Sequence, residues 1–128
     1  MEQSVTNFIN NLKRRNISGF YAETIPQAKN LAETFIPKDS GVGISGSKTL
    51  DELGIVASLE ARGNKVFNQH KPGISREKSL EERNLGAQAD YYLTSANAIS
   101  QAGELVFFSG YGQRISGIAN AKNVIVIC

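Results

Sequence analysis

Apolar residues near the start of the chain recur with the spacing of an amphipathic helix. The positions i, i+3, i+4 and i+7 are occupied by Val5, Phe8, Ile9 and Leu12. This spacing forms one apolar face, so a helix is predicted over roughly residues 2–15. The apolar run at residues 17–21 then predicts a short strand.

A second helix is predicted from its own start and stop signals. Thr24 can cap it, and Gln27 can complete a capping box. Pro26 is tolerated in the first turn, because the N–H that proline lacks has no hydrogen-bond partner there. An apolar stripe continues until Pro37, which ends the helix.

The rest of the chain alternates between strand-like and helix-like segments. Strands are predicted at residues 41–45, 65–68, 90–94, 104–108 and 123–127, and helices at residues 49–62, 76–87 and 113–120. In the first of these helices, Thr49 and Glu52 have capping-box spacing, and Gly63 is suited to end it. The alternation predicts an α/β fold: a mostly parallel sheet flanked by helices, in a Rossmann-like three-layer arrangement. With no repeat or linker, a single domain over residues 1–128 is expected.

The last run, VIVIC, is rich in β-branched residues. Such runs are typical of strands buried at the centre of a parallel sheet. The apolar strand also predicts a buried interface between copies, and therefore a homodimer or larger assembly. The sequence leaves open whether Cys128 is the natural C-terminus.

Composition narrows the functional classes. The net charge of +2 argues for neither nucleic acid nor a membrane surface as a partner. Cys128 is the one cysteine, so neither an intrachain disulfide nor a multi-cysteine metal site can form. We expect no metal and no cofactor. The N-terminus is too polar for a signal peptide, which makes the cytoplasm the expected location.

The loop after the strand at residues 41–45 is a candidate anion site. It contains Gly46, Ser47, Lys48 and Thr49, between a strand end and a helix start. Free backbone N–H groups, hydroxyls and the Lys48 ammonium would favour a phosphate or carboxylate there. The residues alone equally allow Ser47 or Thr49 to act only as the helix cap.

The same segment contains a G-x-G-x-x-G pattern at residues 41–46. A dinucleotide site would need a strand before the first glycine and an acid about 20 residues later. Pro37 argues against that strand, and Asn68 follows the next strand in place of an acid. A nucleotide site is therefore not expected.

A second candidate loop region lies between residues 95 and 114. Ser95 and Asn97 follow one predicted strand, and Gly110, Gly112 and Arg114 follow the next. The glycines permit close backbone approach, and Arg114 could pair bidentately with a carboxylate or phosphate. Asn97 cannot act as a general base, so it would orient a ligand or satisfy backbone groups of the loop.

Candidate catalytic groups are few. His70 is the sole histidine and lies in a loop after a strand, so it is the first candidate for proton transfer near neutral pH. Glu52 is the next, although its capping role is an alternative. Asn97 completes the candidate set as an orienting group. The alternative is that His70 takes no part in catalysis.

Two motif blocks resemble the LUD domain of lactate-utilization proteins. The first comprises LTSANAI at residues 93–99, the GELV run, and the G-x-G-x-R pattern of Gly110, Gly112 and Arg114. The second is GISGSKTLDELG at residues 43–54. The resemblance implies the fold of ribose-5-phosphate isomerase, glucosamine-6-phosphate deaminase and the CoA transferases (the NagB/RpiA/CoA transferase-like superfamily). In that superfamily the first strand–loop–helix holds a phosphate or acyl-CoA, which places Gly43, Gly46 and Ser47 in the anion site.

The resemblance also sets functional expectations. It implies a role in organic-acid (lactate) utilization, with the chain either binding a small anionic metabolite or serving as an accessory subunit to iron–sulfur redox partner proteins. The alternative is an enzyme of isomerase or CoA-transferase type acting on a phosphosugar or acyl-CoA. The resemblance places Asn97 where related sugar-phosphate enzymes carry an acid, and Ser109 where the LUD family often carries one. The two missing acids argue against the alternative. Family members usually continue past the last strand, so a C-terminal segment is expected to be missing.

Overall fold

The computed structural model describes residues 1–128 and contains six helices and six strands. In chain order these are α1 (Gln3–Arg14), α2 (Ile25–Thr34), β1 (Gly41–Ile44), α3 (Lys48–Leu53), α4 (Ile55–Ala61), β2 (Lys65–Phe67), α5 (Arg76–Ala87), β3 (Tyr91–Ser95), β4 (Ala98–Ile99), β5 (Leu105–Val106), α6 (Gln113–Asn120) and β6 (Asn123–Ile127). None of the helices combines the length and the apolar character that crossing a bilayer requires.

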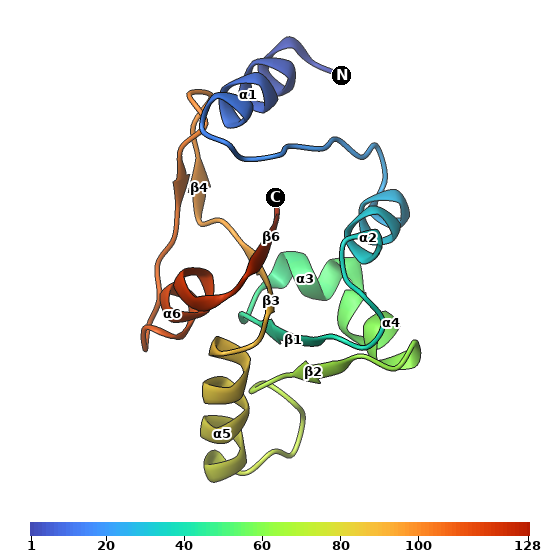
Figure 1. Ribbon diagram of the computed structural model, residues 1–128, viewed down its shortest axis with the longest axis vertical. Coiled ribbons are helices and arrows are strands. Elements are labelled where there is room, and N and C mark those ends of the chain that lie inside the picture. Colours follow the sequence, from blue (N-terminus) through green and yellow to red (C-terminus); the bar gives the residue numbers. More distant parts are fainter.

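The main sheet is fully parallel and has the strand order β2-β1-β3-β6. Helices α2, α3 and α4 cover one face, and α5 and α6 cover the other (Figure 1). The predicted three-layer α/β fold is therefore confirmed. Because the strands are parallel, all their carboxyl ends lie at one edge of the sheet, where the loops that follow β1, β2 and β3 meet.

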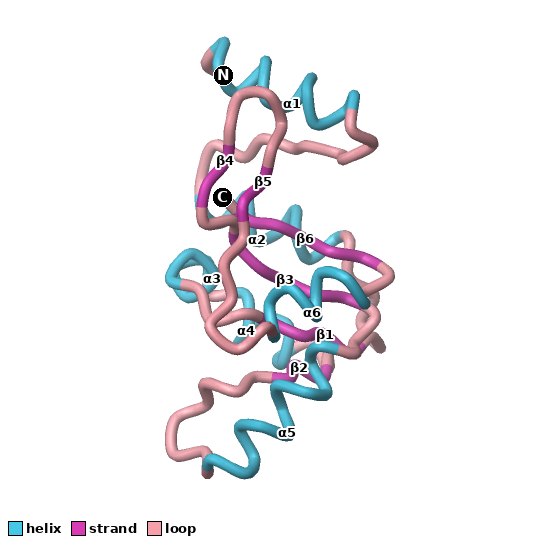
Figure 2. The backbone as a smooth tube through the Cα atoms, turned by 90° about the vertical axis from the view of Figure 1, so that its left-hand side faces the viewer, coloured by secondary structure: helices cyan, strands magenta, loops and turns pink.

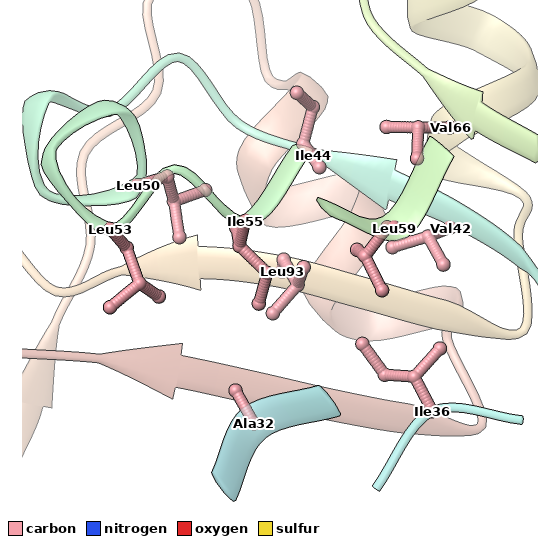
Figure 3. Packing of buried hydrophobic residues seen from close by; sticks show 10 residues of the cluster. All are labelled: Ala32, Ile36, Val42, Ile44, Leu50, Leu53, Ile55, Leu59, Val66 and Leu93. Atoms are coloured by element: carbon pink, nitrogen blue, oxygen red, sulfur yellow. The ribbon is translucent and has the colours of Figure 1, made fainter. Parts of the chain in front are cut away.

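The hydrophobic core lies between the sheet and α2–α4 (Figure 3). It is formed by Ala32, Ile36, Val42, Ile44, Leu50, Leu53, Ile55, Leu59, Val66 and Leu93. Val42 and Ile44 alternate with Gly43 along β1, so their side chains point to this face while Gly43 faces the other.

The opposite face is built on close contact through glycines. A Cβ added to Gly43 would lie 2.7 Å from the carbonyl carbon of Gly86 in α5 and 2.8 Å from Cδ1 of Tyr92. A Cβ added to Gly117 in α6 would lie 2.6 Å from the same ring carbon. The missing side chains let α5 and α6 approach the sheet, with the buried Tyr92 ring against both glycines.

Most predicted helix boundaries are confirmed, but the prediction of one helix over residues 49–62 is wrong. Gly54 adopts a left-handed conformation, with φ of 67°, and separates α3 from α4. Glycine takes this conformation without a Cβ penalty, so the break occurs there. The predicted Thr49–Glu52 capping box is also wrong: Ser47 caps α3, and its Oγ accepts from Leu50 N at 3.3 Å.

The predicted strand at residues 17–21 does not form. This segment runs from α1 toward α2 without a strand partner, because no edge of either sheet lies along it (Figure 1). By contrast, the start of α2 agrees with its prediction: Thr24 Oγ1 accepts from Gln27 N at 3.2 Å.

The segment predicted as a strand at residues 104–108 contributes only β5, which lies outside the main sheet. It pairs antiparallel with β4 in a separate hairpin, because the short connection at residues 100–104 can join two strands only in the antiparallel sense. Helix α1 lies against this hairpin (Figure 2). Asn11 Nδ2 donates to the Gln101 carbonyl at 2.8 Å, and Arg15 Nε donates to the Ala102 carbonyl at 3.1 Å.

The last strand, β6, has the predicted boundaries but not the predicted central place. It pairs with β3 alone and forms an edge of the sheet. Ile125 and Ile127 pack against the core while remaining partly exposed. The β-branched composition thus identified the strand correctly, but composition carries no information about which strands lie beside it.

Candidate functional site

Two pairs of hydroxyl groups join the carboxyl ends of β1 and β3. The hydroxyls of Ser45 and Thr94 lie 2.9 Å apart and are buried. Those of Ser47 and Ser95 lie 2.8 Å apart, closer to the surface. These contacts fix the loop after β1 against the neighbouring strand. Ser47 and Ser95, both predicted as site residues, are therefore brought together.

A cavity of about 590 Å³ opens beside this loop, over the ends of β1 and β2. Its wall is formed by Ile44, Ser45, Gly46, Ser47, Lys48, Leu50, Asp51, Val56, Asn68, His70 and Pro72. Gly46, Ser47, Lys48 and His70 were predicted as site residues. The polar part of the wall combines a hydroxyl, an ammonium, an imidazole, an amide and a carboxylate, so it can both donate and accept hydrogen bonds.

His70 stands over Gly46. A Cβ added to Gly46 would lie 2.6 Å from His70 Nε2, so only glycine leaves room for the ring in this position. The backbone N of His70 donates to Asn68 Oδ1 at 2.9 Å, which fixes the turn. His70 Nε2 lies 3.1 Å from Gln69 Nε2.

Arg114 lies outside the cavity wall and joins two loops. Its Nη2 donates to the carbonyl of Gly46, and its Nη1 donates to Asn97 Oδ1, each at 2.8 Å. The same Asn97 oxygen accepts from the backbone N of Phe108, also at 2.8 Å. Asn97 thus satisfies groups of the protein itself. We call the set formed by Arg114, Asn97 and the Gly46 carbonyl the brace.

The glycine loop before α6 shapes the start of that helix. Gly112 has a φ of 81°, and Gly110 faces open space. Ser109 Oγ accepts from the backbone N of Arg114 at 3.2 Å, and Gln113 Oε1 accepts from Tyr111 N at the same distance. These bonds hold the first turn of α6 and thereby the direction in which Arg114 leaves it.

Among the predicted residues of β1 and α3, three lie apart from the cavity wall, as do Ser95, Asn97, Gly110, Gly112 and Arg114. Gly43 is inside β1, against α5. Thr49 and Glu52 belong to α3 but do not line the cavity, and Glu52 is exposed. The sequence analysis missed Asp51 as a wall residue. Its spacing of i+3 from Lys48 was an available signal, because both then project from one side of a helix.

Two pKa shifts concern groups near the sheet. Burial raises the pKa of Tyr92 to about 12, and the nearby Arg114 opposes this increase. Burial also raises the pKa of the Cys128 thiol. No three side chains of His, Cys, Asp or Glu are arranged to hold a metal ion.

Comparison with known families assigns the chain to one of them. A model of the LUD domain matches residues 5–128. The chain belongs to the LUD domain family. Neither the comparison with curated proteins nor that with solved structures gives a match. Every residue of the cavity wall and of the brace lies within the matched LUD domain.

Proposed function

We propose that this LUD-domain protein takes part in organic-acid (lactate) utilization and binds a small anionic metabolite in the cavity beside β1 and β2. The observation that carries the proposal is the cavity wall itself, which brings Ser47 and Lys48, at the start of α3, together with Asn68 and His70, from the loop after β2. Lys48 forms none of the ion pairs of the structure, so its charge is available to a ligand.

The volume of the cavity bears on the size of the metabolite. At about 590 Å³ it is within the range of roughly 300–1,000 Å³ that is usual for small-molecule sites. A three-carbon acid would occupy a small part of it. The class of ligand to be tested therefore extends from lactate and pyruvate to phosphosugars and CoA esters.

The alternative function is an enzyme of isomerase or CoA-transferase type. His70 is the observation that favours it, because the imidazole lines the cavity and histidine is the side chain that most often serves in general acid–base catalysis. Glu52 lies outside the wall, and Asn97 is occupied by the brace, so His70 is the main candidate among the three. Turnover of a phosphosugar or acyl-CoA that is lost in His70→Ala would establish this alternative.

We also propose a homodimer, and an accessory role beside iron–sulfur redox proteins. The apolar residues of β6 are partly exposed, and the outer edge of this strand pairs with no other strand. Both features support an interface between copies. Light scattering at micromolar concentration should give a dimer mass, and a clean monomer would refute this part. A pull-down that repeatedly recovers no redox protein would count against the accessory role.

The metabolite proposal is tested by a thermal-shift panel of lactate, pyruvate, phosphosugars, CoA esters and nucleotides. A ligand at 100 times its dissociation constant should stabilise the protein by about 2.7 kcal/mol. Lys48→Ala and Ser47→Ala should abolish the shift, because they remove the free charge and a hydroxyl donor. Lys38→Ala is the matched control, since Lys38 is an exposed lysine that does not line the cavity. A shift that persists in Lys48→Ala would contradict the proposed site, and a panel without any shift would contradict metabolite binding.

A further inference from the structure

The brace acts on a peptide group that lines the cavity, although Arg114 and Asn97 do not line it themselves. Gly46 and Ser47 are wall residues, and the carbonyl of Gly46 accepts from Arg114 Nη2 at 2.8 Å. That carbonyl is therefore held toward Arg114 in α6, a residue that does not line the cavity. Arg114 reaches it across 68 residues of sequence.

The position of the carbonyl determines the direction of the next amide. In a planar trans peptide the N–H of Ser47 points opposite to the C=O of Gly46. With the carbonyl turned to Arg114, the Ser47 N–H points away from Arg114. Neither the Gly46 nor the Ser47 amide donates to an acceptor within the chain, so both are available to a ligand.

This peptide needs a restraint because glycine turns easily. Gly46 is exposed and has no Cβ, so rotation of the Gly46–Ser47 peptide meets little steric resistance. A half-turn would bring the carbonyl oxygen to the cavity, where it would repel an anion and remove a donor. The bond from Arg114 opposes that rotation, and Asn97, itself fixed by Phe108 N, holds the guanidinium in place.

We propose that Arg114 and Asn97 are positioning residues, which hold the Gly46–Ser47 peptide with its N–H toward the cavity so that the backbone contacts a bound anion. The inference rests on the proposed function for the use of that amide. It gives Arg114 a role different from direct pairing with the ligand, because both of its terminal nitrogens are engaged by the protein.

The orientation of the peptide can be measured without any ligand. Residual dipolar couplings of the Ser47 N–H should change in Arg114→Lys, because an ammonium cannot span both acceptors as the guanidinium fork does. They should also change in Asn97→Ala. In Asn97→Asp they should stay as in the wild type, because a carboxylate oxygen accepts the same two bonds. Arg76→Lys, at the start of helix α5, is the matched control, because Arg76 is exposed and takes part in neither the brace nor the loop before α6. An unchanged Ser47 coupling in Arg114→Lys would overturn the proposal whatever the protein binds.

Inorganic phosphate, titrated against the labelled protein, then tests the consequence for binding. In the wild type and in Arg76→Lys, the Ser47 amide resonance should shift on addition of phosphate. In Arg114→Lys the affinity should fall by about tenfold or more, the equivalent of one hydrogen bond to a charged group, although the net charge is unchanged. Equal affinity in the wild type and Arg114→Lys would refute the positioning role and leave the anion site intact. If phosphate shifts no wall amide in the wild type, the anion site fails, and the couplings alone decide whether the brace orients the peptide.

Discussion

The two faces of the main sheet are packed by different means. Toward α2–α4, aliphatic side chains fill the space between layers, and the core can adjust by small movements of several side chains. Toward α5 and α6, Gly43 and Gly117 bring backbone close to Tyr92, and the distance between layers is set by hard contact. The first face thus holds most of the buried hydrophobic residues, while the second restricts the spacing between helices and sheet more strictly.

The functional consequence follows from where each part of the site is attached. The cavity wall includes Ser47, Lys48 and Asp51 from the α3 side, which is packed by aliphatic residues. Arg114 comes from α6, on the face packed through glycine. The brace therefore connects the aliphatic face, where side chains can adjust, to the glycine face, where they cannot. The close contact of α6 with the sheet places the Arg114 guanidinium within reach of the Gly46 carbonyl.

The largest expected effect is that of Gly43→Ala, on the glycine face. The added methyl would meet backbone atoms of Gly86, so β1 and α5 must separate. Because backbone cannot rotate out of the way as a side chain can, the loss of stability should reach about 3 kcal/mol or more, at the upper end for overpacking. Urea denaturation measures it.

Gly110→Ala is the matched control for that prediction. Gly110 faces open space and has no positive φ, so alanine should change the stability by less than about 0.5 kcal/mol. If Gly43→Ala were as well tolerated as Gly110→Ala, the glycine face would not be set by hard contact, and the contrast between the faces would be lost.

Leu59→Ala, on the aliphatic face, should have a smaller effect. Leu59 is fully buried, at 0 % exposure, and its truncation should cost about 2–3 kcal/mol, the lower part of the range for such sites. The reason is that the short helix α4 can settle into the space left behind. Ile115→Ala is the control, because Ile115 is 47 % exposed and little packing is lost. Equal denaturation midpoints for the two variants would contradict the prediction.

The smallest effect concerns alkaline pH and Tyr92. Its pKa is raised to about 12 by burial, whereas in the unfolded chain it lies near 10. The unfolded state therefore loses this proton first, and the contribution of Tyr92 to stability is present below pH 10 and declines between pH 10 and 12. A spectrophotometric titration should show one tyrosine ionising late, and Tyr92→Phe should remove that phase. An unchanged titration curve in Tyr92→Phe would show that another tyrosine is the late one.

Local signals in the sequence were sufficient for most of the secondary structure. The predicted bounds of α5 and α6 agree with the structure because the signals that start, continue and end a helix act within a few residues. The same reasoning failed at residues 17–21 and at β5, since a strand exists only where a partner lies beside it. The break at Gly54 was missed because a glycine in a helical pattern can continue the helix or end it.

In the candidate site, too, some features depend on local sequence and others on contacts between distant segments. The sequence by itself determined the α/β class, the Gly46–Thr49 loop as a candidate, and His70 as the one histidine, because these depend on residue type and near spacing. Only the tertiary structure decided that Asp51 joins His70 in one wall and that Arg114 bonds to the Gly46 carbonyl. Such contacts link residues far apart in the chain, and they depend on how closely α6 packs on β3, which the absence of a side chain at Gly117 permits.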